Sequence, residues 1–132
     1  MEKSNAPQQG QKEVLVVEDD HYTNELIRNT LSLAGYGVAS VHSGEEALGY
    51  LEKKVPDLII LDLLLPQMDG WELCRILRKE GSPTRRVPII IASVISRYEL
   101  DQAQGALGTL SFFNKPFQPK DLIGEVERII RG

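Results

Sequence analysis

The chain alternates short apolar runs with longer segments in which apolar residues recur at the spacing of a helix. Five runs are apolar throughout or nearly so: VLVV (14–17), VASV (38–41), LIIL (58–61), IIIA (89–92) and LSFF (110–113). Unbroken runs of Val, Ile and Leu are typical of strands that are buried on both faces, as they are in parallel sheets. The pattern therefore predicts five strands of a parallel sheet.

Helical spacing marks the segments between and after these runs. The expected helices cover residues 22–34, 44–54, 70–81, 96–107 and 118–132. The fourth is the weakest because Gly105 interrupts it, whereas Ser43 and Glu46 form a capping-box pattern ahead of the second. Strands that alternate with helices give a (βα)5 order. Right-handed crossovers then predict a flavodoxin-like α/β fold, a doubly wound five-stranded parallel sheet with helices on both faces.

Composition narrows the class of protein. A chain of 132 residues is long enough for one domain with a single core, and a formal net charge of −4 argues against direct nucleic-acid binding. The single Cys74 excludes an internal disulfide, which is consistent with a reducing compartment. No apolar stretch approaches the roughly 20 residues of a membrane span. We therefore expect a cytoplasmic protein that does not bind membranes.

The first residues differ from the rest of the chain. Residues 1–12, MEKSNAPQQGQK, are polar, contain Pro and Gly, and offer almost nothing to bury. Such a composition is typical of a disordered terminus. We expect a disordered tail over residues 1–12 and one folded domain over residues 13–132.

Chemically active residues follow the predicted strands directly. Glu18 and Asp19 come after the first strand, Asp62 after the third, Ser93 after the fourth and Lys115 after the fifth. In a doubly wound sheet, ligands bind at the carboxyl ends of the strands, so these side chains should face one crevice. Each residue is weak evidence alone, but their joint placement is a strong signal.

Crowded carboxylates repel one another unless a cation lies among them, and hard oxygen ligands favour Mg²⁺ or Mn²⁺. An ammonium group and a hydroxyl nearby would hold further phosphoryl oxygens. A protein promotes phosphoryl transfer almost entirely by such positioning and by charge neutralisation. The carboxylate of Asp62 can act as the nucleophile and form an aspartyl-phosphate. The residues themselves thus predict a metal-assisted phosphoacceptor.

Four motifs carry a family resemblance over residues 13–131. They are the acidic pair after the first strand, LDLLLPQMDG around Asp62, the serine after the fourth strand, and KPF after the fifth. Together they resemble the receiver domain of response regulators, the phosphoacceptor half of two-component signalling, in its chemotaxis-receiver-like form. The resemblance implies that Asp62 accepts a phosphoryl group from a histidine kinase or a histidine phosphotransfer protein.

The resemblance also implies roles for the neighbouring residues. Asp19, Asp62 and the backbone carbonyl of Leu64 would bind Mg²⁺, with Glu18 acting through water. Lys115 and Ser93 would bind the phosphoryl group, and a cis bond is expected between Lys115 and Pro116.

Phosphorylation would draw Ser93 inward, and Phe112, at the aromatic switch position of the family, would follow. The face of the fourth helix, fifth strand and fifth helix would then change for a downstream effector or output domain. Phosphorylation-dependent dimerisation is left open. The domain is not an enzyme in this interpretation, because it assists only its own phosphorylation and autodephosphorylation.

The sequence departs from the common pattern of the family in several places, and two of these bear on the lifetime of the phosphoryl group. Leu64 and Ile95, two residues after Asp62 and Ser93, are apolar and cannot orient an attacking water. We therefore expect slow autodephosphorylation.

Other functions fit the residues less well. A hydrolase of the haloacid-dehalogenase type needs a second Asp where this chain has Leu64, and a flavin binder needs a phosphate loop where this chain has acids. A phosphorylation-independent interaction module is the remaining alternative, although the intact set of site residues argues against it.

Three further features have simpler interpretations. Asp20 should cap the first helix rather than bind metal. His21 and His42 lack metal-ligand partners at useful spacing and are expected on the surface. The basic cluster in and after the third helix is expected to be a solvated face; it comprises Arg75, Arg78, Lys79, Arg85 and Arg86.

Overall fold

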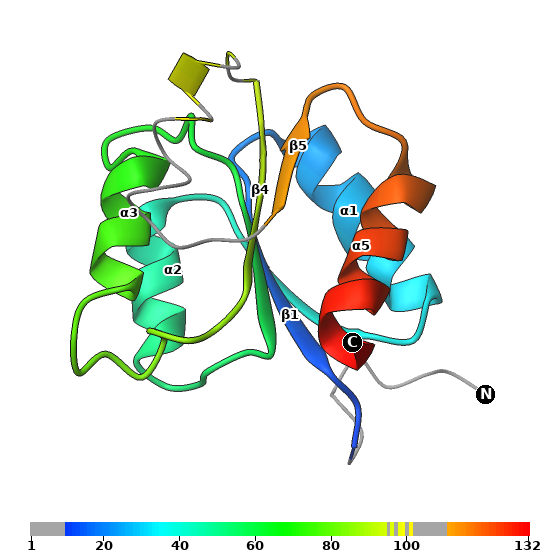
Figure 1. Ribbon diagram of the computed structural model, residues 1–132, viewed down its shortest axis with the longest axis horizontal. Coiled ribbons are helices and arrows are strands. Elements are labelled where there is room, and N and C mark those ends of the chain that lie inside the picture. The colour runs from blue at the N-terminus through cyan, green and yellow to red at the C-terminus, as the bar shows by residue number, and fades with distance from the viewer. Residues whose placement is uncertain (1–9, 95, 97, 100, 102–110) are drawn as a thin grey trace.

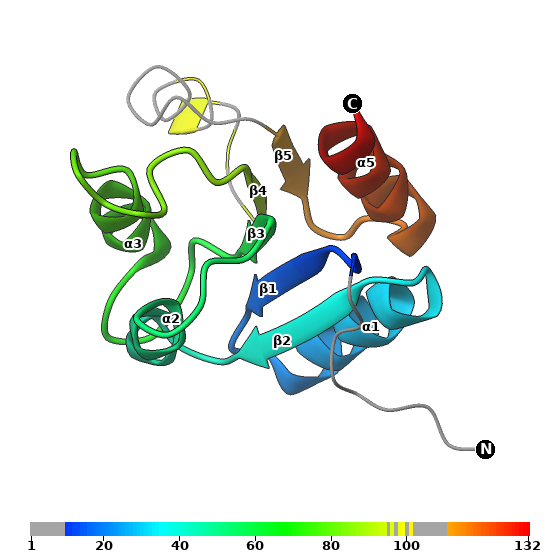
Figure 2. The ribbon, with the colours of Figure 1, turned by 90° about the horizontal axis from the view of Figure 1, so that it is seen from below.

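The computed structural model describes residues 10–94, 96, 98–99, 101 and 111–132. Its strands form one parallel sheet between two layers of helices (Figure 1), in the order β2-β1-β3-β4-β5, which Figure 2 shows from one end. The strands are β1 (Glu13–Val17), β2 (Gly37–Val41), β3 (Leu58–Leu61), β4 (Ile89–Ser93) and β5 (Ser111–Asn114). The five-stranded parallel sheet expected from the apolar runs is confirmed.

Helices cover both faces of the sheet, as expected for a doubly wound fold. Helices α1 (His21–Leu33) and α5 (Pro119–Arg131) lie on one face, and α2 (Gly44–Leu51) and α3 (Gly70–Leu77) lie on the other (Figure 2). The helix expected over residues 96–107 falls mostly outside the described residues. In the described part of the chain, no helix is long and apolar enough to cross a membrane.

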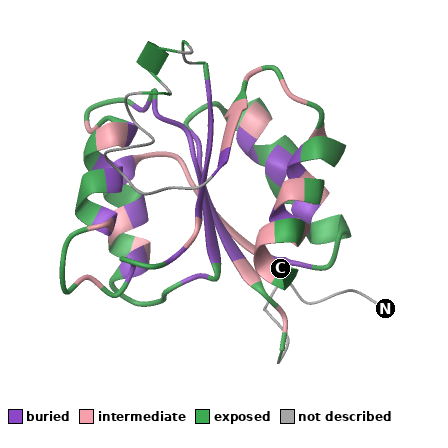
Figure 3. Cartoon of the chain, viewed as in Figure 1, coloured by how far each residue is buried: buried purple, intermediate pink, exposed green. Residues whose placement is uncertain are grey.

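Alternation along the strands divides the core into two layers. In β1, Leu15 and Val17 join the cluster beneath α2 and α3, whereas Val14 and Val16 join the cluster beneath α1 and α5. The central strands are buried throughout, which Figure 3 shows as purple ribbon through the middle of the molecule. The unbroken apolar runs therefore arise because the sheet is covered on both sides.

Polar side chains fix the starts of the first three helices. Asp20 accepts a hydrogen bond from the Thr23 amide at 2.9 Å, and Asp69 accepts one from the Glu72 amide at 2.8 Å. Ser43 likewise accepts from the Glu46 amide at 3.1 Å. The capping box predicted here is only half formed, because the Glu46 carboxylate accepts from the His42 amide rather than from that of Ser43.

Two helices are shorter than predicted. Helix α2 ends at Leu51 rather than residue 54, and α3 ends at Leu77 rather than residue 81. The chain after α3 turns back on the helix end, where the Thr84 hydroxyl donates to the Leu77 carbonyl at 2.8 Å. This bond replaces the partner that another helical turn would supply.

Arg78 also differs from the expected solvated basic face. Its Nη1 atom donates to the carbonyls of Thr84, Arg85 and Val87 at 3.1, 3.0 and 2.7 Å. The side chain therefore holds the loop between α3 and β4 in place. The other members of the cluster are exposed.

Gly70 lets the start of α3 pack directly on the chain that follows β3. Its amide donates to the Leu63 carbonyl at 2.8 Å. A Cβ atom at this position would lie 2.4 Å from the Leu63 Cα atom and 2.6 Å from the Asp62 carbonyl oxygen. Both are backbone atoms that cannot rotate away, so only glycine fits against the segment that carries Asp62.

We predict that Gly70→Ala lowers the free energy of unfolding by about 1–3 kcal/mol, because the added methyl group overpacks against backbone. Gly124→Ala is the matched control in α5, where a Cβ atom would meet nothing within 4 Å. This control should gain about 0.5–1 kcal/mol from helix propensity. Chemical denaturation measures both, and a Gly70→Ala variant as stable as the parent would contradict the packing described.

Candidate functional site

Strand register brings three acids together at the carboxyl edge of the sheet. Val17 of β1 lies opposite Leu61 of β3, so the residues that follow these two strands are neighbours. One carboxylate oxygen from each of Glu18, Asp19 and Asp62 lies within 4.8 Å of those of the other two. The three acids predicted to face one another at this edge are therefore close together, although Glu18 and Asp62 are buried while Asp19 is exposed.

Lys115 reaches this cluster from the end of β5. Its Nζ atom lies 2.5 Å from Glu18 Oε1 and 3.1 Å from Asp62 Oδ2. Its backbone amide donates to the Ser93 carbonyl at 3.0 Å, which holds the chain in place where it leaves the sheet. The bond between Lys115 and Pro116 is cis, as expected. One ammonium group thus bridges the ends of β1 and β3.

Ser93 completes the contacts around the Asp62 carboxylate. The Ser93 side chain is fully buried, and its hydroxyl donates to Asp62 Oδ1 at 2.6 Å. The amide of Leu64 donates to the same oxygen at 3.0 Å. Hydrogen bonds from three segments therefore fix the orientation of this carboxylate, with Lys115 on one oxygen and Ser93 and Leu64 on the other.

For both Glu18 and Lys115, burial and the neighbouring opposite charge shift the pKa in opposite directions. Desolvation raises the pKa of Glu18 to about 7, and the hydrogen bond from Lys115 offsets this only in part. Desolvation also lowers the pKa of Lys115, but the hydrogen bond and charge of Glu18, together with Asp62, outweigh it and leave that pKa raised. Lys115 therefore stays charged near neutral pH, while Glu18 is poised to take up a proton.

Asn24 is a site residue that the sequence interpretation missed. Its side chain is 2% exposed, and its Nδ2 atom donates to the carbonyls of Glu18 and Val41 at 2.9 and 3.0 Å. It therefore ties together the ends of β1 and β2, directly beneath the acidic pair. The available signal was its spacing: Asn24 precedes buried Ile27 and Leu31 by three and seven residues, which places a polar side chain on the buried face of α1.

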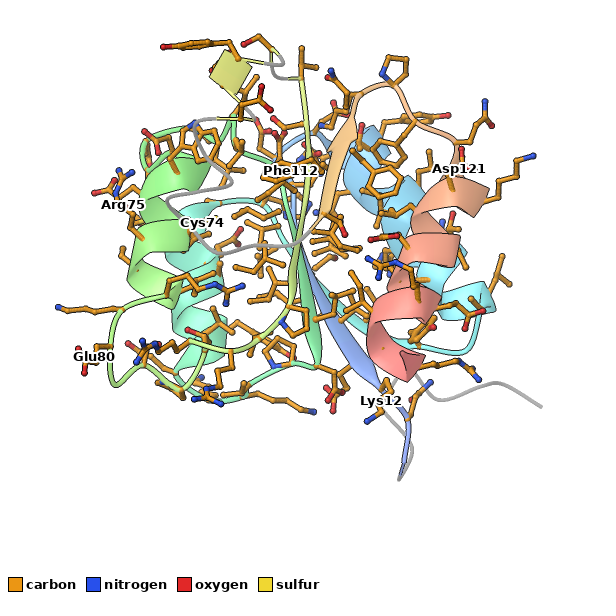
Figure 4. The ribbon with its side chains drawn as sticks, in the orientation of Figure 1. Lys12, Cys74, Arg75, Glu80, Phe112 and Asp121 are labelled. Carbon is orange, nitrogen blue, oxygen red and sulfur yellow. The ribbon has the colours of Figure 1, made fainter. Side chains whose placement is uncertain are left out.

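Of the remaining predicted residues, Leu64 is exposed to solvent and Phe112 is partly buried. The Leu64 side chain is 62% exposed beside Asp62. Phe112 is half-buried on β5 and packs against the core beneath α2 and α3 (Figure 4). Ile95 lies outside the described residues.

The donor set fits a hard divalent cation such as Mg²⁺. All three clustered acids offer carboxylate oxygens, and such oxygens are the ligands that Mg²⁺ and Mn²⁺ prefer. No softer Cys or His ligand belongs to the described cluster.

Comparison with known proteins shows the family to which this chain belongs. The family model for the response regulator receiver domain matches residues 14–127, nearly all of the folded part of the chain. The chain belongs to the response regulator receiver family. The resemblance inferred from the acidic pair, the LDLLLPQMDG segment and the KPF motif is thereby confirmed.

Solved structures of receiver proteins are similar over nearly the whole chain. The chemotaxis response regulator CheY4 of Vibrio cholerae is 30% identical, with a TM-score of 0.82 over 90% of this chain and 98% of that one. A putative response regulator from Chloroflexus aurantiacus is 34% identical, with a TM-score of 0.83 over 92% of this chain and 99% of that one. These similarities confirm the flavodoxin-like α/β fold.

Curated relatives are longer than this chain. The probable transcriptional regulator ycf27 of Porphyridium aerugineum is 37% identical over 92% of the chain and 49% of its own length. The alkaline phosphatase synthesis transcriptional regulatory protein PhoP of Bacillus subtilis is 36% identical over 91% and 49%. The chain therefore spans about half the length of these relatives.

The raised pKa of Glu18 gives this receiver domain a pH-dependent stability. The pKa of Glu18 is about 7 in the folded chain and 4.5 in the unfolded chain, so the folded chain binds the proton more tightly. Ionised Glu18 therefore lowers the free energy of unfolding above about pH 7. This loss disappears as the pH falls towards 4.5. In buffer with EDTA, the free energy of unfolding should rise by on the order of 2 kcal/mol between about pH 8 and about pH 5.5. Denaturation at a series of pH values measures this.

Glu18→Gln serves as the control, because its amide does not titrate. The difference in stability between the parent and this variant should depend on pH in the stated direction. A difference that is constant across the range would show that Glu18 does not carry the effect.

Proposed function

We propose that Asp62 is the phosphoacceptor of this receiver domain and that it takes its phosphoryl group from a histidine kinase or a histidine phosphotransfer protein. The observation that carries the proposal is the pair of contacts on its carboxylate, from Lys115 Nζ at 3.1 Å and from Ser93 Oγ at 2.6 Å. Both donors are of the kind that holds phosphoryl oxygens. Asp62 is also the acid that belongs to the LDLLLPQMDG motif of the family.

The proposed reaction is a transfer from nitrogen to oxygen. An Asp62 carboxylate oxygen attacks the phosphorus of a phosphohistidine, a new P–O bond forms and the P–N bond breaks, and the leaving imidazole takes up a proton. Asp19, Asp62 and the Leu64 carbonyl would hold Mg²⁺, with Glu18 acting through water, and the bound ion would supply charge neutralisation at the phosphoryl oxygens. Lys115 adds a second positive charge beside the same carboxylate.

Ser93 and Phe112 would carry the signal away from the acceptor. The Ser93 hydroxyl donates to Asp62, and Ser93 pairs in register with Asn114, two residues after Phe112. A phosphoryl group on Asp62 would compete for the Ser93 hydroxyl, and movement at the end of β4 would reach Phe112 through the β4–β5 pairing. The proposed output is a changed face over the fourth helix, β5 and α5, which a downstream effector or output domain would bind.

Exposed apolar side chains support a protein as the phosphoryl donor. Tyr22, Leu64 and Val94, close in sequence to Asp19, Asp62 and Ser93, are 77%, 62% and 60% exposed. Apolar groups around a charged site are typical of a protein interaction surface. The domain would work in the cytoplasm with no substrate turnover, acting only on its own phosphorylation state.

Phosphorylation by a small donor tests the acceptor directly. With acetyl phosphate or phosphoramidate and Mg²⁺, the parent chain should gain one phosphoryl group by intact mass, and Asp62→Asn should gain none, because the amide is not a nucleophile. Asp121→Asn, an exposed aspartate in the first turn of α5, is the matched control and should be phosphorylated normally. A parent chain that never gains phosphoryl mass would favour a phosphorylation-independent interaction module.

Leu64 should determine how long the phosphoryl group lasts. Its exposed side chain lies beside the acceptor and offers no hydrogen bond to an attacking water. Leu64→Asn should therefore speed autodephosphorylation several-fold, measured as the decay of phosphorylated chain after the donor is removed. Leu33→Asn, at a leucine 90% exposed at the end of α1, should decay like the parent. Equal decay of the parent and Leu64→Asn would contradict this role.

A further inference from the structure

Two histidines that were expected on the surface without a shared site lie side by side. His21 is the first residue of α1 and His42 follows β2, and their ring centres are 4.6 Å apart with the planes tilted by 36°. The two rings contribute to an open pocket of about 270 Å³ at this edge of the sheet. The other lining residues are Asn24, Glu25, Arg28 and Ser40.

The ring separation matches two imidazoles that share one metal ion. A metal–nitrogen distance of about 2.1 Å puts each ring centre roughly 3.2 Å from the ion, so bond angles of about 90–110° place the two centres about 4.5–5.2 Å apart. The observed 4.6 Å falls inside this range. Imidazole nitrogen suits Zn²⁺, Ni²⁺ and Cu²⁺, whereas Mg²⁺ prefers oxygen.

One carboxylate lies near the His42 ring, and a second lines the pocket. Glu46 accepts a hydrogen bond from the His42 amide at 2.7 Å, and its Oε1 atom lies 4.0 Å from His42 Nδ1. At 4.0 Å the carboxylate makes no hydrogen bond to the ring, but its negative charge favours a cation beside His42. Arg28 brings a positive charge to the pocket, but Glu25 pairs with it at 3.8 Å. The two glutamates therefore outnumber the one arginine.

We propose that His21 and His42 form a binding site for a borderline divalent transition-metal ion, distinct from the acidic cluster. One ring nitrogen of each histidine is a protein ligand, water completes the coordination, and the negative charge of Glu46 favours the ion. An ion bound here links the first turn of α1 to the end of β2, the two segments that Asn24 also joins through its contacts with Glu18 and Val41. The site does not depend on phosphorylation of Asp62.

Calorimetric titration of Zn²⁺ into the full chain tests the proposal, with millimolar Mg²⁺ present to occupy the acidic cluster. The parent should bind one Zn²⁺ ion, His21→Ala and His42→Ala should each weaken binding by at least about tenfold, and the double variant should lose it. Asp19→Asn is the matched control: it removes an acid of the cluster and should leave Zn²⁺ affinity unchanged.

Either of two results with the variants would overturn the site. Zn²⁺ affinity that survives in the double variant, or that is lost in Asp19→Asn, would assign the ion to the acidic cluster instead. Nuclear magnetic resonance of the unsubstituted chain gives a second readout that does not depend on how the variants fold. Zn²⁺ should shift the imidazole nitrogen signals of both His21 and His42, and a titration that leaves either ring unchanged would contradict shared ligation.

Discussion

The ammonium group of Lys115, held between two buried carboxylates, is the interaction on which the candidate site depends. Glu18 and Asp62 are 2% and 5% exposed, and negative charges this deeply buried are costly without a positive partner. Burial still dominates at Glu18, whose pKa rises to about 7 although Lys115 lies 2.5 Å away. The buried carboxylates at the carboxyl edge of this sheet therefore favour positive charge beside them. Positive charge at this edge would also neutralise the oxygens of a phosphoryl group on Asp62.

The backbone beneath the site is fixed from several sides. The Asn24 side chain donates a hydrogen bond to the Glu18 carbonyl, and the Lys115 amide donates one to the Ser93 carbonyl. Gly70 lets α3 pack against the segment that carries Asp62. The Asn24 and Gly70 contacts act over short stretches of chain, whereas the bond between Ser93 and Lys115 joins the ends of β4 and β5, so the geometry of the acids depends on both local turns and the pairing of the sheet. A preorganised site of this kind reduces the reorganisation needed when charge develops at the acceptor.

The sheet and the acidic cluster were predictable because both follow from local patterns and one general rule. A run such as LIIL is buried on both faces, and parallel strands bring their carboxyl ends to one edge, so Asp62 had to lie near Glu18 and Asp19. The end of α3 was not predictable, because it depends on a Thr84 hydroxyl that reaches back from the following loop. The pairing of His21 with His42 depends on how α1 and β2 sit together, which spacing along the chain does not reveal.

A crystal structure of the chain with Mg²⁺ and beryllofluoride, a mimic of the phosphoryl group, tests the central claim most directly. The account predicts beryllofluoride on the Asp62 carboxylate, Mg²⁺ among the oxygens of the acidic cluster, and both the Lys115 ammonium and the Ser93 hydroxyl on the fluorides. Beryllofluoride on another aspartate, or a Lys115 side chain that stays on Glu18 and makes no contact with the fluorides, would contradict it.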